Sequence, residues 1–401
     1  MIGDGWDDTP SVRPGNEPDE TPRTKRRVAV VTGTRAEFGL LRSVMHAIHR
    51  RSELELAVIA AGSHLIAPAE TLREVKAEFN IADAVPMQIA GRTGRVEDAE
   101  SVARGIGRFT RTFERLRPDW VVVLGDRIEA FAAATAASIA GYPVVHIHGG
   151  DRAEGVADEA MRHAITKLAH VHLPATKQSA DRIVRMGERA DRVIVTGSPA
   201  IDELGSIPEL SASRFDELGK PEIVMLLHPL GRPNEIEEAD AAALIEAAFT
   251  STAGDGDRIV ALHPNHDAGR DGIMRALNAA GVRLVSHLPR VEFVGLLKRL
   301  ASLKGALIGN SSAGLIECAA LKVPVVNVGP RQAGRERAAN VFDVDHADPA
   351  MIVKAIDRAR AADLSAMTHP YGDGRAGERA ADALVMINPH EPGMLRKRNT
   401  Y

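Results

Sequence analysis

The 401-residue chain has a single cysteine, Cys318, so no disulfide can form within it. It also lacks long apolar runs, since none approaches the roughly 18–20 residues that a helix needs to span a bilayer. The sequence therefore excludes a disulfide-stapled scaffold and predicts a soluble protein of a reducing compartment. We expect the cytoplasm, with no membrane partner.

Aromatic residues are scarce, with two Trp, three Tyr and nine Phe, so a groove that stacks bases or sugar rings is not expected. Charge of one sign is lacking as well, because 50 basic and 54 acidic residues give a formal net charge of −4. We therefore expect no nucleic-acid partner. The 44 % of apolar and 26 % of charged residues are ordinary for a globular protein, and the length fits two or three domains.

Residues 1–27 hold four prolines among acidic residues and lack the apolar stretch of a signal peptide. They end in the basic cluster Lys25-Arg26-Arg27. We interpret this segment as a disordered tail and the cluster as a solvated lead-in to the first strand, rather than as a nucleic-acid or targeting patch.

From Arg27 the chain alternates short β-branched runs with longer segments of helical period, a pattern typical of a parallel sheet covered by helices. The first half has five candidate strands: Val28–Val31, Leu56–Ala60, Trp120–Leu124, Val144–Ile147 and Val193–Val195. A second series follows: Ile223–Leu227, Ile259–Leu262, Val282–Val285, Ala306–Ile308 and Val323–Val328. The fold class is therefore α/β, with two doubly wound, Rossmann-like lobes.

The segment Ser198–Lys220 contains Pro199 and Pro208 and no long apolar periodicity, so we place the connection between the lobes there. The expected units are a tail over 1–27, an N-terminal lobe over 28–205, a C-terminal lobe over 206–372, and a helix with a polar tail over 373–401. The last helix is expected over Gly374–Ile387.

Ligands of open α/β sheets bind beyond the carboxyl ends of the strands. The first expected strand runs into Gly33-Thr34-Arg35, where a tight turn leads into a helix whose free amides favour an anion. The turn is not a G-x-G-x-x-G motif, so no dinucleotide cofactor is indicated. An ordinary turn with a solvated Arg35 stays an equal alternative.

Acidic residues follow two neighbouring strands, in Gly125-Asp126-Arg127 and in His148-Gly149-Gly150-Asp151. Glycines allow a ligand to approach the backbone, and adjacent carboxylates suit proton transfer. A helix is expected over Ala157–His170, with Asp158 on its flank. One face of this helix is apolar, and the other gathers Glu159, Arg162, His163, Thr166 and His170.

A surface helix stabilised by the pairs Asp158–Arg162 and Glu159–His163 is the alternative for this segment. Because the helix begins soon after Asp151, we favour a functional role for its acidic end. Its histidines lack the i, i+4 spacing around a glutamate that is typical of a zinc helix, so no metal is expected.

The second half carries residues that suit a phosphate. Its strand Ala306–Ile308 leads into Gly309-Asn310-Ser311-Ser312 and then into a helix over Leu315–Lys322. Hydroxyls and free amides at a helix start bind anions, although Ser312 could simply cap the helix. Further polar residues lie near other strand ends or in the first helical turn: His228, His263, Asn265, Glu317, Arg331 and Arg335. Together they predict a lobe that binds a nucleoside diphosphate and faces a lobe that carries acids.

These residues resemble the hydrolysing UDP-N-acetylglucosamine 2-epimerases of sialic-acid-type sugar pathways. The resemblance runs from Arg27 to about Ile387. It is carried by Thr32-Gly33-Thr34-Arg35-Ala36-Glu37, Gly125-Asp126-Arg127, His148-Gly149-Gly150, the run from Asp158 to Lys167, Gly309-Asn310-Ser311-Ser312, and the run from Arg331 to Glu336.

The resemblance implies the GT-B fold, with the active site in the cleft between the lobes and a C-terminal helix that crosses back to the first lobe. It implies anti elimination of UDP with loss of the C2 proton, followed by addition of water to the 2-acetamidoglucal. The products would be UDP and the free 2-epimeric sugar, N-acetylmannosamine when the substrate is UDP-N-acetylglucosamine. It further implies no redox cofactor and a homodimer.

By this match, Asp126 and Asp158 are the acids expected to transfer protons, with the base and acid roles left open. The diphosphate would be held by Arg35, Arg127, His228, Ser311, Ser312 and Arg331. Glu317 would hold the ribose and Asn265 would lie near the nucleotide. His228 is also a candidate to protonate the leaving UDP. The other binding candidates are Glu159, Arg162, His163, His263 and Arg335.

The chain departs from the family at Asp151, where the family usually carries a catalytic glutamate. A proton-transfer group misplaced by ~1 Å can lose on the order of 10²-fold in rate. Either the substrate sits closer, or Glu154 takes part, or the sugar differs, for example a 2,4-diacetamido-2,4,6-trideoxy sugar. The alternatives are a non-hydrolysing epimerase, a glycosyltransferase of the same fold, and a catalytically impaired sugar-nucleotide-binding protein.

Overall fold

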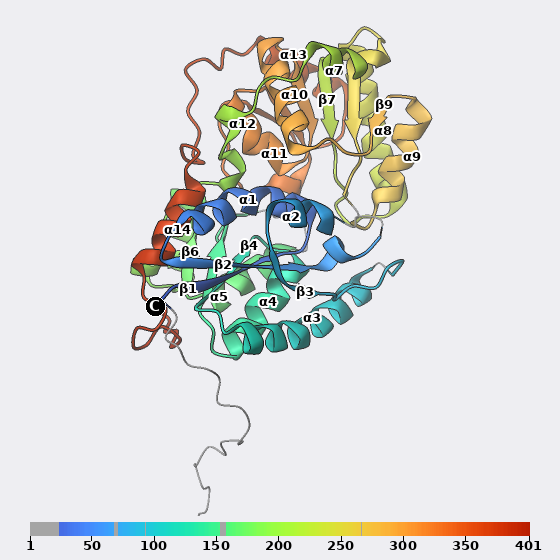
Figure 1. The fold of residues 1–401 in the computed structure, drawn as a ribbon. Coiled ribbons are helices and arrows are strands. Elements are labelled where there is room, and N and C mark those ends of the chain that lie inside the picture. The colour runs from blue at the N-terminus through green and yellow to red at the C-terminus, as the bar shows by residue number, and fades with distance from the viewer. Residues whose placement is uncertain (1–23, 68–70, 93, 153–157, 266) are drawn as a thin grey trace, which may run out of the picture.

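The computed structural model describes residues 24–67, 71–92, 94–152, 158–265 and 267–401 (Figure 1). The expectation of a tail over 1–27 therefore falls almost wholly outside the described residues. The first strand begins at Arg26, earlier than expected, and the end of the basic cluster is partly buried. Nη1 of Arg26 donates to the carbonyl oxygens of Leu384 and Ile387, at 3.0 and 2.9 Å.

Residues of the first half form a six-stranded parallel sheet in the order β3-β2-β1-β4-β5-β6. Its strands are β1 (Arg26–Thr32), β2 (Leu54–Ala61), β3 (Ile81–Val85), β4 (Trp120–Leu124), β5 (Val144–Ile147) and β6 (Val171–Leu173). The helices of this half are α1 (Arg35–Arg50), α2 (Leu72–Glu78), α3 (Arg95–Leu116), α4 (Ile128–Ile139), α5 (Asp158–Leu168) and α6 (Lys177–Arg185).

The second half forms another six-stranded parallel sheet, in the order β12-β11-β10-β7-β8-β9. Its strands are β7 (Ile223–Leu226), β8 (Ile259–Leu262), β9 (Arg283–Val285), β10 (Ala306–Gly309), β11 (Val325–Val328) and β12 (Val341–Val344). Its helices are α7 (Ala212–Glu217), α8 (Asn234–Ser251), α9 (Arg270–Ala280), α10 (Arg290–Ser302), α11 (Ser312–Leu315), α12 (Glu317–Leu321) and α13 (Pro349–Ala361). The last helix is α14 (Ala376–Met386), and residues 387–401 follow it.

Both sheets have the same doubly wound order, with their first and fourth strands side by side. In such sheets the chain leaves these two strands in opposite directions and opens a crevice at their carboxyl ends. The crevices lie beyond β1 and β4 in the first sheet and beyond β7 and β10 in the second. The topology therefore brings four loops to the places where a doubly wound sheet binds ligands.

The expected strands Trp120–Leu124, Val144–Ile147 and Ile259–Leu262 are confirmed, whereas Val193–Val195 is wrong as a strand. Only one isolated bridge joins Val193 to His172. We also missed β3, β6 and β12, whose few residues include Asp83, His172 and Asp343. Polar residues in such short runs hide the apolar signal of a strand.

The helix expected over Leu315–Lys322 is two short helices, α11 and α12, broken at Ile316. The N-cap of α11 is Ser311 rather than Ser312, because Oγ of Ser311 accepts from the amide of Ala313 at 3.4 Å. The last helix was expected over Gly374–Ile387 and is observed as α14.

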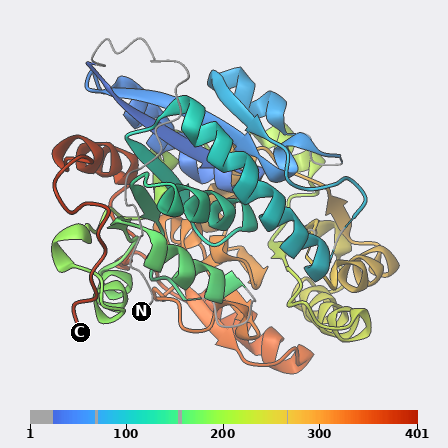
Figure 2. The same ribbon diagram turned by 90° about the horizontal axis from the view of Figure 1, so that it is seen from below.

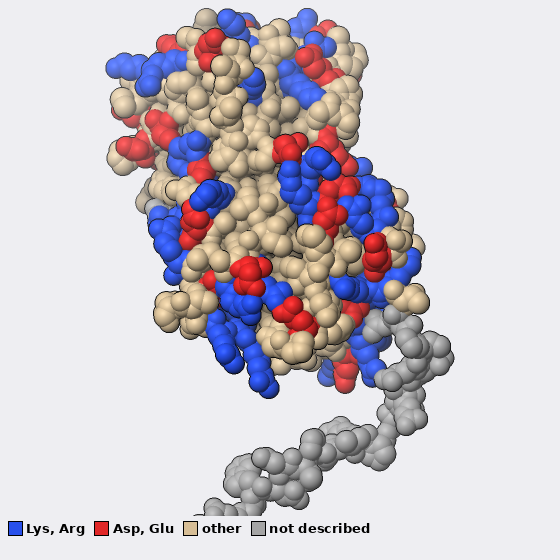
Figure 3. Space-filling model, turned by 90° about the vertical axis from the view of Figure 1, so that its left-hand side faces the viewer, with Lys and Arg blue, Asp and Glu red and all other residues tan. Residues whose placement is uncertain are grey.

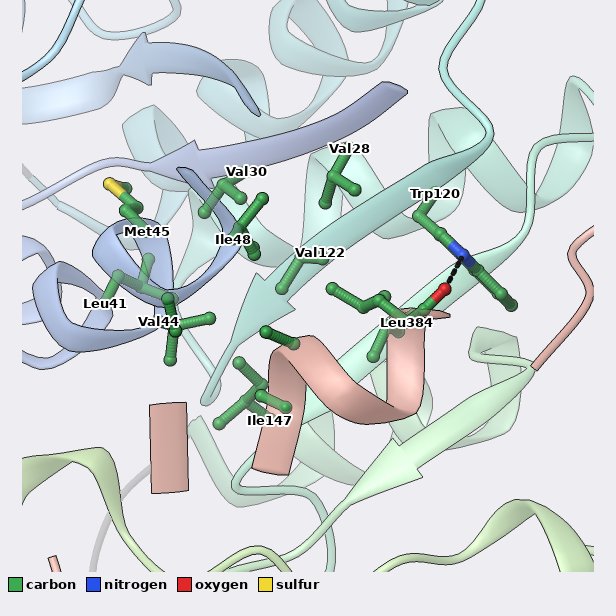
Figure 4. Close-up of a cluster of buried hydrophobic side chains, with 14 of the residues drawn as sticks. Val28, Val30, Leu41, Val44, Met45, Ile48, Trp120, Val122, Ile147 and Leu384 are labelled. Carbon is green, nitrogen blue, oxygen red and sulfur yellow. Dashed lines mark hydrogen bonds between the residues drawn. The ribbon is translucent and has the colours of Figure 1, made fainter. Parts of the chain in front are cut away.

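Figure 4 shows a buried cluster in which the sheet, α1 and α14 meet. Val28 and Val30 of β1 and Val122 of β4 lie in this cluster with Ile48 of α1 and Leu384 of α14. Trp120 is fully buried, and its Nε1 donates to the carbonyl oxygen of Leu384 at 3.2 Å. Residues near the end of the chain thus complete the core of the first lobe, and Figure 2 shows α14 lying along that lobe.

On the face shown in Figure 3, Lys and Arg side chains lie next to Asp and Glu side chains, in keeping with the small net charge. No helix within the described ranges is both long and apolar enough to cross a membrane.

Candidate active site

Among the described residues, several ion pairs join the two lobes, and two of them involve expected site residues that follow β4, β5 and β11. Nη2 of Arg335 lies 3.7 Å from Oδ2 of Asp151, and Nη1 of Arg127 lies 3.6 Å from Oδ1 of Asp267. Asp151 and Arg127 belong to the first lobe, whereas Arg335 and Asp267 belong to the second. The structure therefore brings Asp151, Arg127 and Arg335, three of the expected site residues, to the interface between the lobes.

Asp126 follows β4 and forms an ion pair with Arg162, which reaches it from α5. Arg162 is buried, and its Nη1 also donates to the carbonyl oxygen of Asp151 at 3.1 Å. Asp126 keeps 19 % of its side chain exposed, so its carboxylate is both anchored and open to a ligand. The acid expected from the sequence is thus positioned by another expected residue.

Positive charge from both lobes gathers around Arg162. Burial lowers the pKa of Arg162, and the charges of Arg335 and Arg331 lower it further, to about 9. The three guanidinium groups repel one another. A bound anion would relieve this repulsion, so the arrangement favours anion binding. This convergence is what a diphosphate site requires.

Asp151 lies at the centre of a buried hydrogen-bond network. Its Oδ2 lies 2.9 Å from Nδ1 of His148, and its Oδ1 accepts from Oγ of Ser179 at 2.7 Å. Burial alone would raise the pKa of Asp151, but His148, Arg335 and Ser179 outweigh it and lower the pKa to about 2. The carboxylate is therefore ionised, and the geometry suits it to hold His148 and Arg335 in place.

His148 has a left-handed backbone, with φ of 61°, which is uncommon for a residue other than glycine. Its Nε2 lies 3.0 Å from Oγ of Ser198, and its amide donates to the carbonyl oxygen of Leu173 at 3.2 Å. Contacts of both ring nitrogens and of the amide thus hold His148 in this strained conformation. Such strain occurs where the surrounding structure fixes a functional loop.

The helix expected over Ala157–His170 is α5, which begins at Asp158. Nε2 of His163 lies 3.4 Å from Oε1 of Glu159, so the helical pair expected as the structural alternative does form. Glu159 also pairs with Arg152 at 3.8 Å. Glu154 lies outside the described residues, as does the side chain of Asp158, so their expected roles stay predictions.

In the second lobe, Asn310 and His228 bind the ends of β10 and β7 together. Oδ1 of Asn310 accepts from the amide of His228, and its Nδ2 donates to the carbonyl oxygen of the same residue, both at 2.8 Å. The amide of Asn265 donates to Nδ1 of His228 at 3.2 Å. The neutral ring therefore carries its proton on Nε2.

Burial lowers the pKa of His228 to about 3, with a further contribution from the charge of Arg331. A neutral imidazole can donate one hydrogen bond from Nε2 to a phosphate oxygen. The nearby Arg331 supplies the positive charge, and its Nη1 donates to the carbonyl oxygen of Asn310 at 3.3 Å. Ser311 and Ser312 follow Asn310 directly, so these five residues share one crevice.

Glu317, the residue expected to hold a ribose, is buried at the start of α12. Burial raises its pKa, whereas the charges of Arg290, His148 and Arg335 lower it. Oε1 of Glu317 lies 3.8 Å from Nη1 of Arg290. These neighbours place Glu317 on the side of the second lobe that faces His148.

Arg35, expected to hold phosphate, begins α1 and pairs with Glu74 at 2.8 Å. Its charge also contributes to a lowered pKa of His287, which burial mainly causes, so Arg35 faces the second lobe. Asn265 contacts Asp267 through its Nδ2, at 2.5 Å, and Asp267 is also the partner of Arg127. His263 lies 3.5 Å from Arg270, measured from Nδ1 to Nη2.

Several residues of the site were missed in the sequence. Ser179 and Ser198 hold Asp151 and His148, Asp267 joins Arg127 to Asn265, and Nε2 of Gln332 donates to the carbonyl oxygen of Asn310 at 2.9 Å. These residues lie on helices and loops that tertiary folding brings to the strand ends. Of these residues, only Gln332 could have been suspected from the sequence, because it lies between Arg331 and Arg335, two expected site residues.

No three His, Cys, Asp or Glu side chains in the described part of the chain gather so that they could hold a metal ion. Cys318 is buried in α12, and burial raises the pKa of its thiol well above the ordinary value. Its position is that of a packing residue.

Two facing doubly wound lobes with a site at their shared interface define the GT-B fold, which is confirmed by solved structures. UDP-GlcNAc 2-epimerase from Neisseria meningitidis, bound to UDP-GlcNAc, is 20 % identical with a TM-score of 0.73. The alignment covers 90 % of this chain and 99 % of that chain. The enzyme from Methanocaldococcus jannaschii, in complex with UDP-GlcNAc and UDP, is 17 % identical over the same shares, with a TM-score of 0.74.

Residues 46–385 match the family model described as UDP-N-acetylglucosamine 2-epimerase, and the chain belongs to this family. A relative from Legionella pneumophila, the hydrolyzing UDP-N,N'-diacetylbacillosamine 2-epimerase, is 36 % identical over 94 % of this chain and its own full length. The hydrolyzing GDP/UDP-N,N'-diacetylbacillosamine 2-epimerase of Campylobacter jejuni is 30 % identical over 80 % of this chain and 84 % of that protein. The resemblance drawn from the motifs is confirmed.

Proposed function

We propose that this protein is a hydrolysing 2-epimerase of a UDP-2-acetamido sugar. As substrate we propose a UDP-2,4-diacetamido-2,4,6-trideoxy sugar, the class to which N,N'-diacetylbacillosamine belongs. The names of the Legionella and Campylobacter relatives support this choice. The observation that carries the proposal is the meeting of carboxylates from the first lobe with guanidinium groups from the second, seen in the Asp151–Arg335 pair.

The reaction needs both kinds of group in one place. In the first step the C2–H bond of the sugar breaks, its proton goes to a carboxylate, and the C1–O bond electrons leave with UDP. The sugar then carries a C1–C2 double bond. In the second step water adds its hydroxyl to C1 while a proton returns to C2 on the other face. A positioned carboxylate serves the proton transfers, and cationic donors stabilise the leaving diphosphate.

The described residues divide between these tasks. Asp126 is the anchored carboxylate that stays partly exposed, so it is our first candidate for proton transfer. Asp158, at the start of α5, is the second. Arg331, Arg335 and the neutral His228 would hold the diphosphate, with Nε2 of His228 donating to the leaving oxygen.

Asp151 stands where the family usually carries a catalytic glutamate. Its carboxylate accepts from Ser179 and lies in hydrogen-bond reach of His148, and a pKa of about 2 makes it a weak base at neutral pH. We propose that Asp151 acts by holding His148 and Arg335. A longer glutamate would have to displace these contacts, so the shorter side chain fits a site arranged for a different sugar.

The test is product identification with a panel of UDP-2-acetamido sugars. Proton NMR in heavy water is expected to show UDP, a free sugar of inverted C2 configuration, and deuterium at C2. The trideoxy diacetamido substrate is expected to give the highest kcat/KM. A sugar that stays attached to UDP would identify a non-hydrolysing enzyme, and binding without turnover of any sugar would identify a sensor.

We further propose that the two lobes comprise residues 28–205 and 206–372, that residues 373–401 return to the first lobe, and that the enzyme works as a cytoplasmic homodimer. Light scattering on the purified chain measures the mass directly. A mass of one chain across the working concentration range would overturn the dimer.

A further inference from the structure

Two buried glutamates outside the expected site residues lie beneath the first crevice. Glu37 is in the first turn of α1, and Glu129 is in the first turn of α4. Their side chains are almost fully buried, with residue exposures of 4 % and 0 %. Because α1 and α4 follow β1 and β4, both carboxyl groups lie under the loops that carry Arg35, Asp126 and Arg127.

These carboxyl groups have few hydrogen bonds. Oε2 of Glu37 accepts from the amide of Gly33, the residue before the N-cap Thr34, at 2.7 Å. The other three carboxyl oxygens of the pair have no hydrogen-bond partner among the described residues. Both side chains pack against Gly33, and two charged carboxylates around one backbone segment in a protein interior are costly, which favours a proton on one of them.

Ionisable groups from neighbouring elements surround the pair. Arg127 precedes α4, and its Nε lies 3.8 Å from Oε2 of Glu129. The 3₁₀ helix η1 (Gly62–Leu65) carries His64, which hydrogen-bonds to Thr32 and Thr71 at 3.0 and 2.6 Å. Burial lowers the pKa of His64 to about 4, so His64 is neutral. Asp267 of the second lobe also faces Arg127, at 3.6 Å from Nη1, so the guanidinium group lies between Glu129 and Asp267.

Glu129 also determines the path of both neighbouring loops. A Cβ atom on Gly33 would come within 2.4 Å of Cγ of Glu129, and one on Gly62 within 2.2 Å of its Oε1. Both backbones therefore rest directly on this side chain. Gly33 is also the residue whose amide is bound by Glu37, so the two glutamates together fix the turn that leads to Arg35.

We propose that Glu37 and Glu129 form a proton-sharing carboxyl pair that positions the Gly33–Arg35 turn and Arg127 for the substrate's diphosphate. The identity of that ligand rests on the proposed function. With one shared proton, the pair carries a single negative charge close to Arg127, which also pairs with Asp267. Loss of the proton adds a second negative charge beneath the anion site and drives the two carboxylates apart.

The pH range of this change follows from the surroundings. Burial and the charge of Glu129 raise the pKa of Glu37 to about 8, although the amide of Gly33 and the charge of Arg127 oppose the shift. The binding-competent form is therefore lost as the pH rises through 8. An apparent Kd increases as the inverse of the competent fraction, so the Kd for UDP is expected to rise about tenfold between pH 7 and pH 9.

The test is calorimetric titration with UDP from pH 7 to pH 9, on wild type and on Glu129→Gln. The glutamine amide replaces the shared proton, so the ratio of the Kd values at pH 9 and pH 7 is expected to fall to less than twofold. Ionisation of uracil or of Arg162 would affect both proteins alike. The matched control is Glu78→Gln, which removes a carboxylate on α2 that pairs with Arg42 and is expected to follow wild type.

An infrared measurement tests the proton itself and needs no turnover. Wild type at pH 7 is expected to show the carbonyl stretch of a protonated, buried carboxyl group, which disappears above pH 9. In Glu129→Gln the band is expected to disappear at lower pH, because burial of Glu37 remains but the charge of Glu129 is gone. If that variant does not fold, Glu37→Gln is measured in the same way. An unchanged pH dependence in the variant, or no such band at pH 7, overturns the pair. Failure of every sugar substrate with the band present overturns the proposed function alone.

Discussion

The two lobes have the same strand order but place different groups beyond the corresponding strands. Beyond β1 and β4, the first sheet places carboxylates, including those of Asp126 and the Glu37–Glu129 pair. Beyond β7 and β10, the second sheet places His228, Ser311 and their neighbour Arg331. The comparison shows that the fold supplies the positions, whereas a few side chains in the loops decide what each position does.

The lobes also differ in how they tune their titratable groups. In the first lobe, burial and the charge of Glu129 raise the pKa of Glu37 to about 8. Burial would also raise the pKa of Asp151, but His148 and Arg335 outweigh it and lower this pKa to about 2. In the second lobe, burial and then Arg331 lower the pKa of His228 to about 3. The first lobe thus has carboxyl groups in both protonation states, and the second keeps a neutral hydrogen-bond donor.

The largest effect is expected from Asp126→Asn in the first lobe. The amide cannot take up a proton, so kcat is expected to fall by about 10²- to 10⁴-fold, the usual contribution of a general acid or base. The Kd for UDP is expected to change by less than about threefold if the second lobe holds the nucleotide. Steady-state kinetics and calorimetry measure the two quantities.

The matched control for this change is Asp181→Asn, on the exposed face of α6, where Asp181 pairs with Lys177. It is expected to keep wild-type kcat. A loss of UDP affinity in Asp126→Asn as large as its loss of kcat would contradict the division of labour between the lobes.

The opposite pattern is expected from Arg331→Ala in the second lobe. The change removes a charge-assisted donor near His228 and Asn310, which is worth about 1.5–3 kcal/mol, or roughly 10- to 100-fold in affinity. The Kd for UDP and the KM are expected to rise by this factor, with a smaller fall in kcat. Arg358→Ala on α13 is the matched control. A variant that lost kcat and kept its KM would place Arg331 in the chemical step instead.

Much of this comparison was visible in the sequence, because β4 and β8 are continuous apolar runs, β5 is apolar except for His146, and the residues that follow these strands are polar or glycine. Positions at strand ends are local, so Asp126, His228 and Ser311 could be found without coordinates. The partners of these residues are not local. Ser198 meets His148 across fifty positions of sequence, and no periodicity predicts such a contact.

The buried carboxyl pair shows the same limit. Glu37 belonged to a motif on which the resemblance depended, yet in the sequence it could be any glutamate of a first helical turn. Its role depends on burial and on Glu129, which follows a different strand. Sequence pattern locates side chains along an element, whereas desolvation depends on everything packed around them.

A smaller effect, on stability, is expected from Asp151→Asn. The pKa of Asp151 is lowered from 3.8 to about 2, so its charge contributes about 2 kcal/mol to folding at neutral pH. This contribution is present above pH 3.8 and is lost as the pH falls toward 2. Urea unfolding at pH 7 is expected to show the loss in the variant, and the difference from wild type should shrink near pH 3. A difference that stays constant with pH would mean that packing, not charge, is responsible.

The smallest effect is expected from Lys397→Met in the C-terminal segment that returns to the first lobe. Nζ of Lys397 lies 2.7 Å from Oε2 of Glu188 and contacts the carbonyl oxygens of Thr166 and Ala169 at the end of α5. Lys167 and His172 remain beside Glu188, at 2.6 and 3.2 Å, so the variant keeps most of the compensation for this buried charge. A loss of about 1 kcal/mol is therefore expected.

Hydrogen exchange locates this loss within the molecule. Amides of α5 and α6 are expected to exchange faster in Lys397→Met, whereas those of α10 and α13 in the second lobe stay as in wild type, because every named contact of Lys397 lies in the first lobe. Lys354→Met on α13 is the matched control and is expected to leave both lobes unchanged. Equal acceleration in both lobes would show that the two sheets unfold as one unit. In that case the difference between the lobes would be one of chemistry alone, since their stabilities would be coupled.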